Sequence, residues 1–266
     1  MEGRRKYAID RQANLIELLQ KNGYCSVTEL SSKLAVSPMT IRRDLHALAE
    51  QQIIQVTHGG ARLSYHKQSE PNFHVRSHVH QAEKQTIGRY AATLVDAGDV
   101  IGIDAGSTTI EVARNLPTVP LNIVTYSFPV AAAVVGNEMH NLVLLCGQFH
   151  HETLSFSGVQ TVNTLHGLRI NKLFLATSGL LIPDGLSSSY LFDVEVKQAL
   201  IRSSRQVILC MDSSKIGQIF LAHFAPLKEV HTLVTDGAIS TTDREVLERC
   251  NIRVLVAPVE ENMVLP

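Results

Sequence analysis

The chain has 266 residues, which suffices for one large domain or for a small domain followed by a medium-sized one. Its 45% hydrophobic and 18% charged residues are typical of a globular protein that buries an apolar core. No apolar run approaches the roughly 18 residues of a membrane span, and the charged first twenty residues lack a secretory apolar segment, so we expect a cytoplasmic protein.

Charge is unevenly distributed along the chain, although the net charge is only −1. Residues 1–63 contain nine Lys and Arg against six Asp and Glu, a balance of +3, whereas residues 64–266 contain fifteen against nineteen, a balance of −4. A small basic module on a mildly acidic body suits a DNA-binding protein, and chance alone also produces an excess of this size.

The cysteines are scattered and form no CxxC pair, so we expect buried free thiols rather than a disulfide or zinc framework. They are Cys25, Cys146, Cys210 and Cys250. We predict no cofactor, no metal site and no catalytic residue.

The first two predicted helices lie in the basic module. Residues 11–20 repeat apolar side chains at helical spacing, and Gly23 follows where a helix would end. Ser26 and Glu29 have the spacing of a capping box, in which the hydroxyl accepts the Glu29 N–H and the carboxylate reaches back. The second helix therefore starts near residue 26, and a tight break at residues 35–36 ends it.

A third helix is predicted over residues 37–50, with Ser37 as its cap and a proline at its first position. Ile41, Leu45 and Leu48 share one face, and the opposite face carries basic and small polar side chains. That outward face consists of Met39, Thr40, Arg42, Arg43 and His46. Arginine binds guanine or phosphate, so the spacing fits a helix-turn-helix at about residues 25–44, and an ordinary helical hairpin fits it equally well.

A β-hairpin is predicted next. Residues 53–57 are β-rich, residues 58–60 (HGG) form a turn, and residues 61–63 return. A hairpin directly after a helix-turn-helix is typical of a winged DNA-binding domain.

The motifs of this module resemble those of the DeoR family of bacterial sugar-metabolism regulators. Residues 37–45 (SPMTIRRDL) and 58–61 (HGGA) match the family's VS-x-x-TIRRDL signature and its HGGA wing. The resemblance implies a winged helix-turn-helix over residues 8–63 that binds double-stranded operator DNA. One departure lies in the wing, where the family usually has an arginine and this chain has QVT at residues 55–57, so we expect a weaker phosphate contact there. The DNA-contacting residues that the resemblance implies are Ser37, Met39, Thr40, Arg42, Arg43, His46, His58 and Gly59.

Residues 64–80 are polar, contain a proline and few aliphatic side chains, and are predicted to be a linker. His74, His78 and His80 allow a metal site as the alternative, but no Cys, Asp or Glu ligand set accompanies them, and a solvated linker is favoured.

From residue 81 onward, apolar β-like runs alternate with segments long enough for a helix, which indicates a parallel sheet covered on both faces. The predicted strands are residues 100–103, 121–125, 142–146, 173–176, 206–211, 233–235 and 254–257. Polar residues follow almost every strand, and in a parallel sheet they would gather along one rim, where ligands bind. The loop at residues 104–109 (DAGSTT), together with Lys215, suits a small phosphorylated sugar or polyol, although such a loop is often only a good helix cap.

This larger region resembles the effector domain of the DeoR family, whose fold is like that of pentose-phosphate isomerases. The matching segments include residues 83–84, 104–109, 157–158, 195–197, 212–215 and 235–236. The resemblance implies an effector-sensing α/β domain over residues 81–260, with Tyr126 and Gln148 as departures at the rim where the family has Asn and Gly. The effector-binding residues that it implies are Asp104, Gly106, Ser107, Thr108, Thr109, Thr125, Ser127, Gly179, Lys197, Asp212 and Lys215.

The favoured function is therefore a transcriptional repressor of a sugar or polyol operon, released by a phosphorylated effector and assembled as a homodimer or homotetramer, with no membrane partner. A sugar-phosphate isomerase-like enzyme with an appended DNA-binding domain is the alternative, in which Asp104, Glu195, Asp212 and Lys215 supply acid, base and phosphate anchor. A third possibility is a constitutive DNA-binding protein whose sensor domain has lost its ligand.

Overall fold

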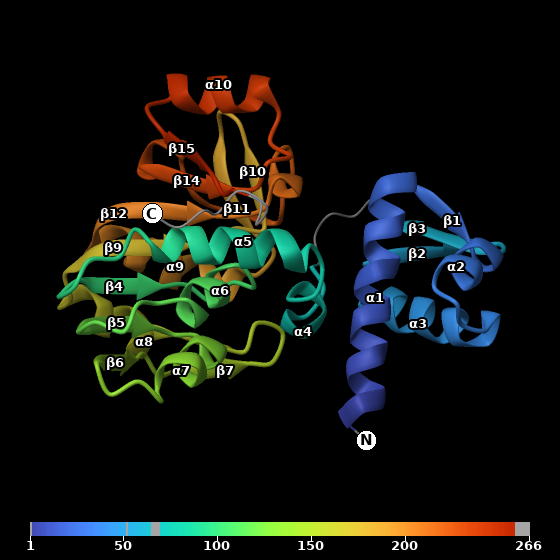
Figure 1. Cartoon of the computed structure of the whole chain (residues 1–266), viewed down its shortest axis with the longest axis horizontal. Helices are drawn as coiled ribbons and strands as arrows, with labels where there is room; N and C mark the ends of the chain where they lie inside the picture. The colour runs from blue at the N-terminus through green and yellow to red at the C-terminus, as the bar shows by residue number, and fades with distance from the viewer. Residues whose placement is uncertain (1, 52, 65–69, 259–266) are drawn as a thin grey trace. The chain divides into compact units, whose positions relative to one another are not determined.

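The computed structural model describes residues 2–51, 53–64 and 70–258, and the chain divides into two compact units, Met1–Gln81 and Ala82–Pro266 (Figure 1). Each unit has its own hydrophobic core and is described by itself.

The first unit is a winged helix-turn-helix, as predicted. Three antiparallel strands in the order β1-β3-β2 form its sheet, and the β2–β3 hairpin is the predicted wing. Strand β1 was not predicted, because three residues are too few to show a pattern. The elements in chain order are α1 (Glu2–Asn22), β1 (Tyr24–Ser26), α2 (Val27–Lys33), α3 (Pro38–Glu50), β2 (Ile54–Thr57), β3 (Gly60–Leu63) and α4 (Phe73–Arg76).

Both predicted helix caps are present. Ser37 Oγ accepts the Thr40 N–H at 3.2 Å at the start of α3, and Ser26 Oγ accepts the Glu29 N–H at 3.1 Å at the start of α2. The Glu29 carboxylate also accepts a hydrogen bond from Lys33 Nζ at 2.9 Å, one turn further along the exposed face. The hydrogen bond from Lys33 lowers the pKa of Glu29, and a backbone hydrogen bond from Ser26 adds to this shift, as the predicted capping box requires.

The core of the first unit forms where α1, α2, α3 and the sheet meet. The predicted inner stripe of α3, Ile41, Leu45 and Leu48, is fully buried there. Burying each such side chain contributes about 1.5–3 kcal/mol, so this stripe fixes how α3 is turned and which of its side chains face outward.

Part of the segment that the sequence predicts as a linker packs within the first unit. Val75 and Val79 are buried in its core, His78 Nε2 lies 3.3 Å from Asp10 Oδ1 of α1, and the His80 N–H donates to Glu17 Oε1 at 2.8 Å. Residues 65–69 of that segment lie outside the described residues. Within the described part of the chain, no group of three or more His, Cys, Asp or Glu side chains could hold a metal ion.

The second unit is built on a seven-stranded sheet in which every pair of neighbours is parallel, in the order β15-β14-β12-β9-β4-β5-β6. All seven predicted strands are present, but β9 begins three residues earlier than expected, and β6 and β12 begin two residues earlier. The strands are β4 (Val100–Ile103), β5 (Leu121–Thr125), β6 (His140–Leu144), β9 (Ile170–Leu175), β12 (Ser204–Cys210), β14 (Thr232–Thr235) and β15 (Arg253–Val256).

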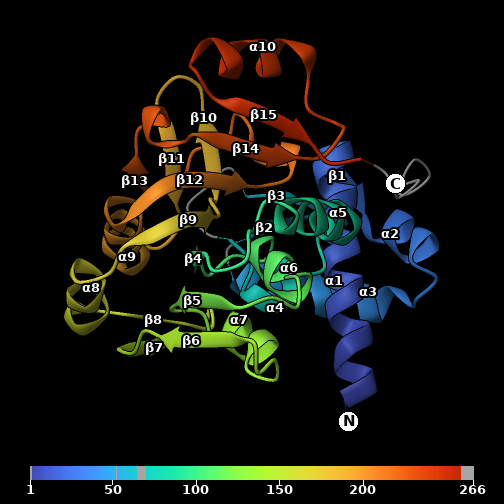
Figure 2. The same cartoon turned by 60° about the vertical axis from the view of Figure 1, so that its left-hand side comes forward.

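Helices cover both faces of this sheet. The chain runs outward from β4 to β6 in one direction and from β9 to β15 in the other, so right-handed crossovers place their helices on opposite faces. Figure 2 shows α5 and α6 on one side of the strands and α8 and α9 on the other. The helices are α5 (Gln81–Ala92), α6 (Thr109–Arg114), α7 (Phe128–Val134), α8 (Val159–His166), α9 (Leu191–Ser203) and α10 (Thr241–Arg249).

Two small antiparallel sheets extend the second unit and were not predicted. Their strands have only three or four residues, too few for a readable pattern. They are β7 (Gln148–His150) with β8 (Ser155–Ser157), and β10 (Gly179–Leu181) with β11 (Gly185–Ser188) and β13 (Ala222–Ala225); short 3-10 turns η1 (Ser213–Lys215) and η2 (Leu227–Glu229) complete the unit.

The cysteines are free, as predicted, but only two of them are buried. Cys25 and Cys210 lie in the two cores, whereas Cys146 and Cys250 are exposed, because one follows the edge strand β6 and the other ends α10 at the surface. None of the helices in the described ranges is both long enough and apolar enough to cross a membrane.

A buried ion pair that the sequence did not predict joins α3 to α1. Asp44 of α3 is only 2% exposed, and Arg11 of α1 binds it through Nε to Oδ2 and through Nη2 to Oδ1, the latter at 3.1 Å. Asp44 raises the pKa of Arg11 by this hydrogen bond.

Replacing this carboxylate should destabilise the first unit. We expect Asp44→Ala to lower the free energy of unfolding by about 3 kcal/mol, because it leaves a mostly buried guanidinium without its partner. Glu50→Ala on the same helix removes an exposed contact to His46 and should change the free energy of unfolding by less than about 0.5 kcal/mol. Urea denaturation of the full chain, with hydrogen exchange of α1 and α3, measures both, and equal effects of the two variants would contradict the assignment.

Candidate DNA-binding face and ligand crevice

The outward face of α3 is composed as predicted. Met39 is 71% exposed, Arg42, Arg43 and His46 are exposed, and Thr40 is half-buried beside the capping Ser37. No hydrogen bond or ion pair within the described residues involves the side chain of Arg42 or Arg43. Both guanidinium groups are therefore available to a phosphate or a base edge.

The wing carries an exposed turn and one arginine, Arg62, that was not among the predicted DNA-contacting residues. His58 and Gly59 are exposed at the turn, and Gly59 has a φ of 83°, which favours glycine. Gln55 pairs directly across the hairpin with Arg62, whose Nε and Nη2 donate to Gln55 Oε1 at 2.9 and 2.7 Å. The two-residue turn sets this register, so a cation lies opposite Gln55 on the wing.

In the second unit, the direction of strand order reverses between β4 and β9, and ligands of open α/β sheets bind at such a switch point. Asp104 follows β4 directly, and Ala176 follows β9. Asp104 Oδ2 accepts the Ala176 N–H at 2.8 Å, and Lys197 Nζ of α9 donates to Asp104 Oδ2 at 2.5 Å and to the Ala176 carbonyl at 3.0 Å. Two predicted effector residues, Asp104 and Lys197, therefore meet at the switch point.

Two further side chains complete this arrangement. Tyr126 follows β5, and its hydroxyl lies 2.5 Å from Asp104 Oδ1 and 2.7 Å from Asp193 Oδ1. Lys197 Nζ lies 3.4 Å from Asp193 Oδ2. All four residues are buried. We call Asp104, Tyr126, Asp193 and Lys197 the crevice cluster. Asp193 was not among the residues predicted from the sequence, although its i,i+4 spacing to Lys197 on a helix was a signal.

Burial and mutual charge shift the pKa values of this cluster. Burial raises the pKa of Tyr126 well above its usual range, and the negative charges of Asp104 and Asp193 add to that shift. Burial also raises the pKa of Asp193, against an opposing effect of Lys197. Burial alone would lower the pKa of Lys197, but the two carboxylates outweigh it, so that this pKa is raised.

The loop at residues 104–109 uses part of its polar groups internally. Thr109 Oγ1 donates to the Asp104 carbonyl at 2.7 Å and accepts the Gly106 N–H at 2.9 Å. A Cβ on Gly106 would lie 2.3 Å from Ala176 Cβ, so the close approach of the loop to the end of β9 requires glycine. The hydroxyls of Ser107 and Thr108 make no hydrogen bond within the described residues, which leaves them to a ligand.

The other predicted effector residues are more widely spread. Thr125 Oγ1 donates to the Ile103 carbonyl at 2.7 Å, and buried Ser127 caps α7. Gly179 begins β10, where a Cβ would lie 2.4 Å from the Gln218 carbonyl oxygen. Asp212 and Lys215 follow β12, which is separated from β4 by β9, and Lys215 Nζ lies 6.0 Å from the centre of the Phe220 ring.

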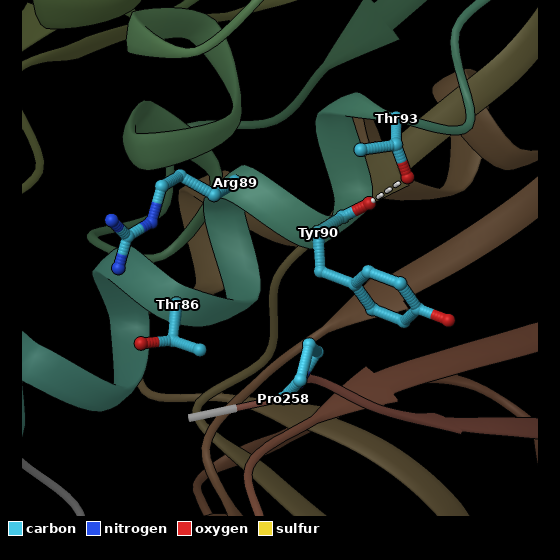
Figure 3. A pocket seen from close by; sticks show the side chains of 5 residues that line it. All are labelled: Thr86, Arg89, Tyr90, Thr93 and Pro258. Carbon is cyan, nitrogen blue, oxygen red and sulfur yellow. Dashed lines mark hydrogen bonds between the residues drawn. The ribbon is translucent and has the colours of Figure 1, made fainter. Parts of the chain in front are cut away.

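A separate shallow hollow lies on α5. Figure 3 shows that Thr86, Arg89, Tyr90 and Thr93 line it together with Pro258, and that the Thr93 hydroxyl donates to the Tyr90 carbonyl, at 2.7 Å. None of the predicted effector residues lines it.

Both units match known families. A family model for the DeoR-like helix-turn-helix domain matches residues 11–67, and one for the DeoR C-terminal sensor domain matches residues 79–237.

Curated relatives match over nearly the whole length of both chains. The HTH-type transcriptional regulator YulB of Bacillus subtilis is 32% identical over 95% of this chain and 98% of the relative. The glycerol-3-phosphate regulon repressor of Escherichia coli is 32% identical over 92% and 97%, and the HTH-type transcriptional regulator IolR of Bacillus subtilis is 31% identical over 88% and 92%.

Among solved structures, ribose 5-phosphate isomerase A from Methanocaldococcus jannaschii is similar over 50% of this chain and 53% of that chain, with 17% identity and a TM-score of 0.38. Similarity at this level carries no argument about activity.

The raised pKa values of Tyr126 and Lys197 predict a loss of stability at alkaline pH. In the unfolded chain these groups release protons near about pH 10, whereas the folded chain retains them, so their contribution is full below that pH and falls above it. We expect Tyr126→Phe to be less stable than the natural protein at pH 8, and the gap to narrow above about pH 10. Urea denaturation between pH 8 and pH 11 measures the gap; a gap independent of pH would contradict the buried, protonated phenol.

Proposed function

The chain belongs to the DeoR family of transcriptional regulators, and on that premise we propose that it represses an operon for sugar or polyol metabolism. In this proposal the first unit binds the operator in the cytoplasm, and a phosphorylated sugar or polyol bound to the second unit releases it. The exposed basic face of α3, opposite a fully buried stripe, is the observation that carries the proposal.

The operator contacts follow from that face and from the wing. In a winged helix-turn-helix, the second helix enters the major groove and its outward side chains meet base edges, while other groups bind phosphates. We propose Arg42 and Arg43 as the principal contacts. The remaining proposed contacts are Ser37, Met39, Thr40, His46, His58 and Gly59.

The ligand class is supported by position and chemistry. The proposed effector residues follow the strands of a parallel sheet around its switch point, where Ser107 and Thr108 retain their hydroxyls and Lys215 supplies a positive charge. The name of one relative, the glycerol-3-phosphate regulon repressor, supports both a phosphorylated polyol and repression.

Release of the operator requires that the ligand binds one arrangement of the DNA-binding units more tightly than another. A single helix-turn-helix buries little DNA surface, and dimers bind two half-sites. We therefore propose a homodimer or homotetramer whose paired DNA-binding units change their spacing when ligand binds.

The enzyme alternative is rejected, because the relatives over nearly the full length are named transcriptional regulators. The chemistry agrees with that: Asp104 is already engaged by Lys197 and Tyr126, and Glu195 is exposed on α9 away from that cluster's buried interior.

Removing an arginine from α3 should weaken operator binding. If Arg43 binds a base, we expect Arg43→Ala to weaken the free energy of operator binding by about 1–3 kcal/mol and to relax the preference for the operator sequence. If Arg43 binds phosphate, the variant should bind all DNA sequences more weakly to the same extent, with a shallower dependence on salt concentration. Arg249→Ala removes the same charge from exposed α10 and is the control. Titration of both variants against DNA selected by the natural protein measures this, and unchanged binding by Arg43→Ala would show that this face does not contact DNA.

Removing the cation after β12 should uncouple the ligand from the DNA. We expect Lys215→Ala to bind operator normally and to lose release by phosphorylated compounds, whereas Lys228→Ala, an exposed lysine of η2, should respond like the natural protein. A panel of phosphorylated sugars and polyols is first screened by thermal shift, and operator release is then measured. No stabilisation by any compound would favour the constitutive DNA-binding protein, and loss of DNA binding by Lys215→Ala would indicate a folding role.

A further inference from the structure

At the switch point of the large sheet, where the ligand is proposed to bind, a side chain of the protein itself lies between the polar groups. Tyr126 is fully buried, its ring belongs to the hydrophobic core of the second unit, and its hydroxyl lies between the carboxyl groups of Asp104 and Asp193. A polyol hydroxyl would bind between two such carboxyl groups in the same way. The phenol therefore takes the place that a ligand hydroxyl would otherwise have.

The cluster around Tyr126 is complete in its hydrogen bonds. The three N–H groups of Lys197 face Asp104 Oδ2 at 2.5 Å, the Ala176 carbonyl at 3.0 Å and Asp193 Oδ2 at 3.4 Å. Asp104 Oδ2 also accepts the Ala176 N–H, and its Oδ1 faces the phenol. A ligand that reached these groups would have to break existing hydrogen bonds in a buried site, which is costly.

The charges of the cluster face one another. Lys197 Nζ lies 2.5 Å from Asp104 Oδ2 and 3.4 Å from Asp193 Oδ2, so its positive charge is already balanced by carboxyl groups inside the cluster. The cluster therefore offers no spare positive charge to a phosphate.

We propose that Tyr126 determines the specificity of the ligand crevice: it closes the inner end and restricts the ligand to a short phosphorylated polyol, of the size of glycerol phosphate. This inference rests on the proposed function and names its ligand more closely. The phosphate lies at Ser107 and Thr108, outside the cluster, and longer phosphosugars are excluded because their chain would collide with the phenol. Asparagine, which the DeoR signature has at this position, lacks the ring and would leave that space open.

The test compares the full-length natural protein with Tyr126→Asn and Tyr126→Phe by isothermal titration. The probes are inorganic phosphate, glycerol 3-phosphate, ribose 5-phosphate and fructose 6-phosphate. We expect the natural protein to bind glycerol 3-phosphate at least as tightly as the two sugar phosphates. Tyr126→Asn should gain about tenfold or more for the sugar phosphates, because a hydrogen bond to a charged group is worth at least that factor. Tyr126→Phe keeps the ring and should gain nothing.

Several results would overturn the inference. The inference is wrong if the natural protein binds fructose 6-phosphate about tenfold more tightly than glycerol 3-phosphate. This comparison needs no variant, so it remains decisive even if Tyr126→Asn fails to fold. If Tyr126→Asn and Tyr126→Phe gain the same affinity for the sugar phosphates, the ring of Tyr126 does not exclude these ligands. These results leave the proposed repressor standing, whereas an absence of binding by every probe to all three proteins overturns both the inference and the proposed class of effector.

Discussion

The architecture of the second unit depends on the buried ion pair between Asp104 and Lys197. It joins the end of β4, the end of β9 and the helix α9 at the point where the sheet reverses direction. Burying two charges costs several kcal/mol each, and the pair is tolerated only because every polar atom around it has a partner. That requirement explains why Tyr126, Asp193 and the Ala176 backbone converge on the same place. The switch point of the sheet, where open α/β sheets bind ligands, is thus occupied by the crevice cluster, whose polar groups bind one another.

Because of this constraint, the residues that stabilise the switch point are different from the residues that remain to bind an anion. In the crevice cluster the ammonium group of Lys197 already contacts two carboxyl groups and a backbone carbonyl, so the cluster holds the protein together rather than binding the charge of a ligand. The groups that remain for an anion are the hydroxyls of Ser107 and Thr108 on the loop after β4. The proposed ligand would therefore contact the loop between β4 and α6, outside the crevice cluster.

The sequence predicted what depends on local pattern and missed what depends on distant pairing. Seven apolar runs gave the seven parallel strands, and capping and periodicity gave α2 and α3. Asp104 and Lys197, 93 positions apart, were brought to one rim by strand order and by the family signature. Asp193 was missed because its i,i+4 spacing to Lys197 does not show whether that face of α9 is buried. The QVT segment at residues 55–57 was expected to weaken the phosphate contact of the wing, and only the hairpin register shows that Arg62 lies opposite Gln55.

In the first unit, too, a buried carboxylate is paired with a cation, but here two further cations stay exposed at the surface. In the run Arg42-Arg43-Asp44, adjacent side chains on α3 diverge by the helical turn, so the acid points into the core while both arginines point outward. Arg11 of α1 neutralises that acid in two contacts. Without Arg11, Asp44 would be a buried charge with no partner, which would destabilise the packing of α3. The α1–α3 pair therefore holds α3 in the orientation that places Arg42 and Arg43 on its exposed face, the face proposed to contact the operator.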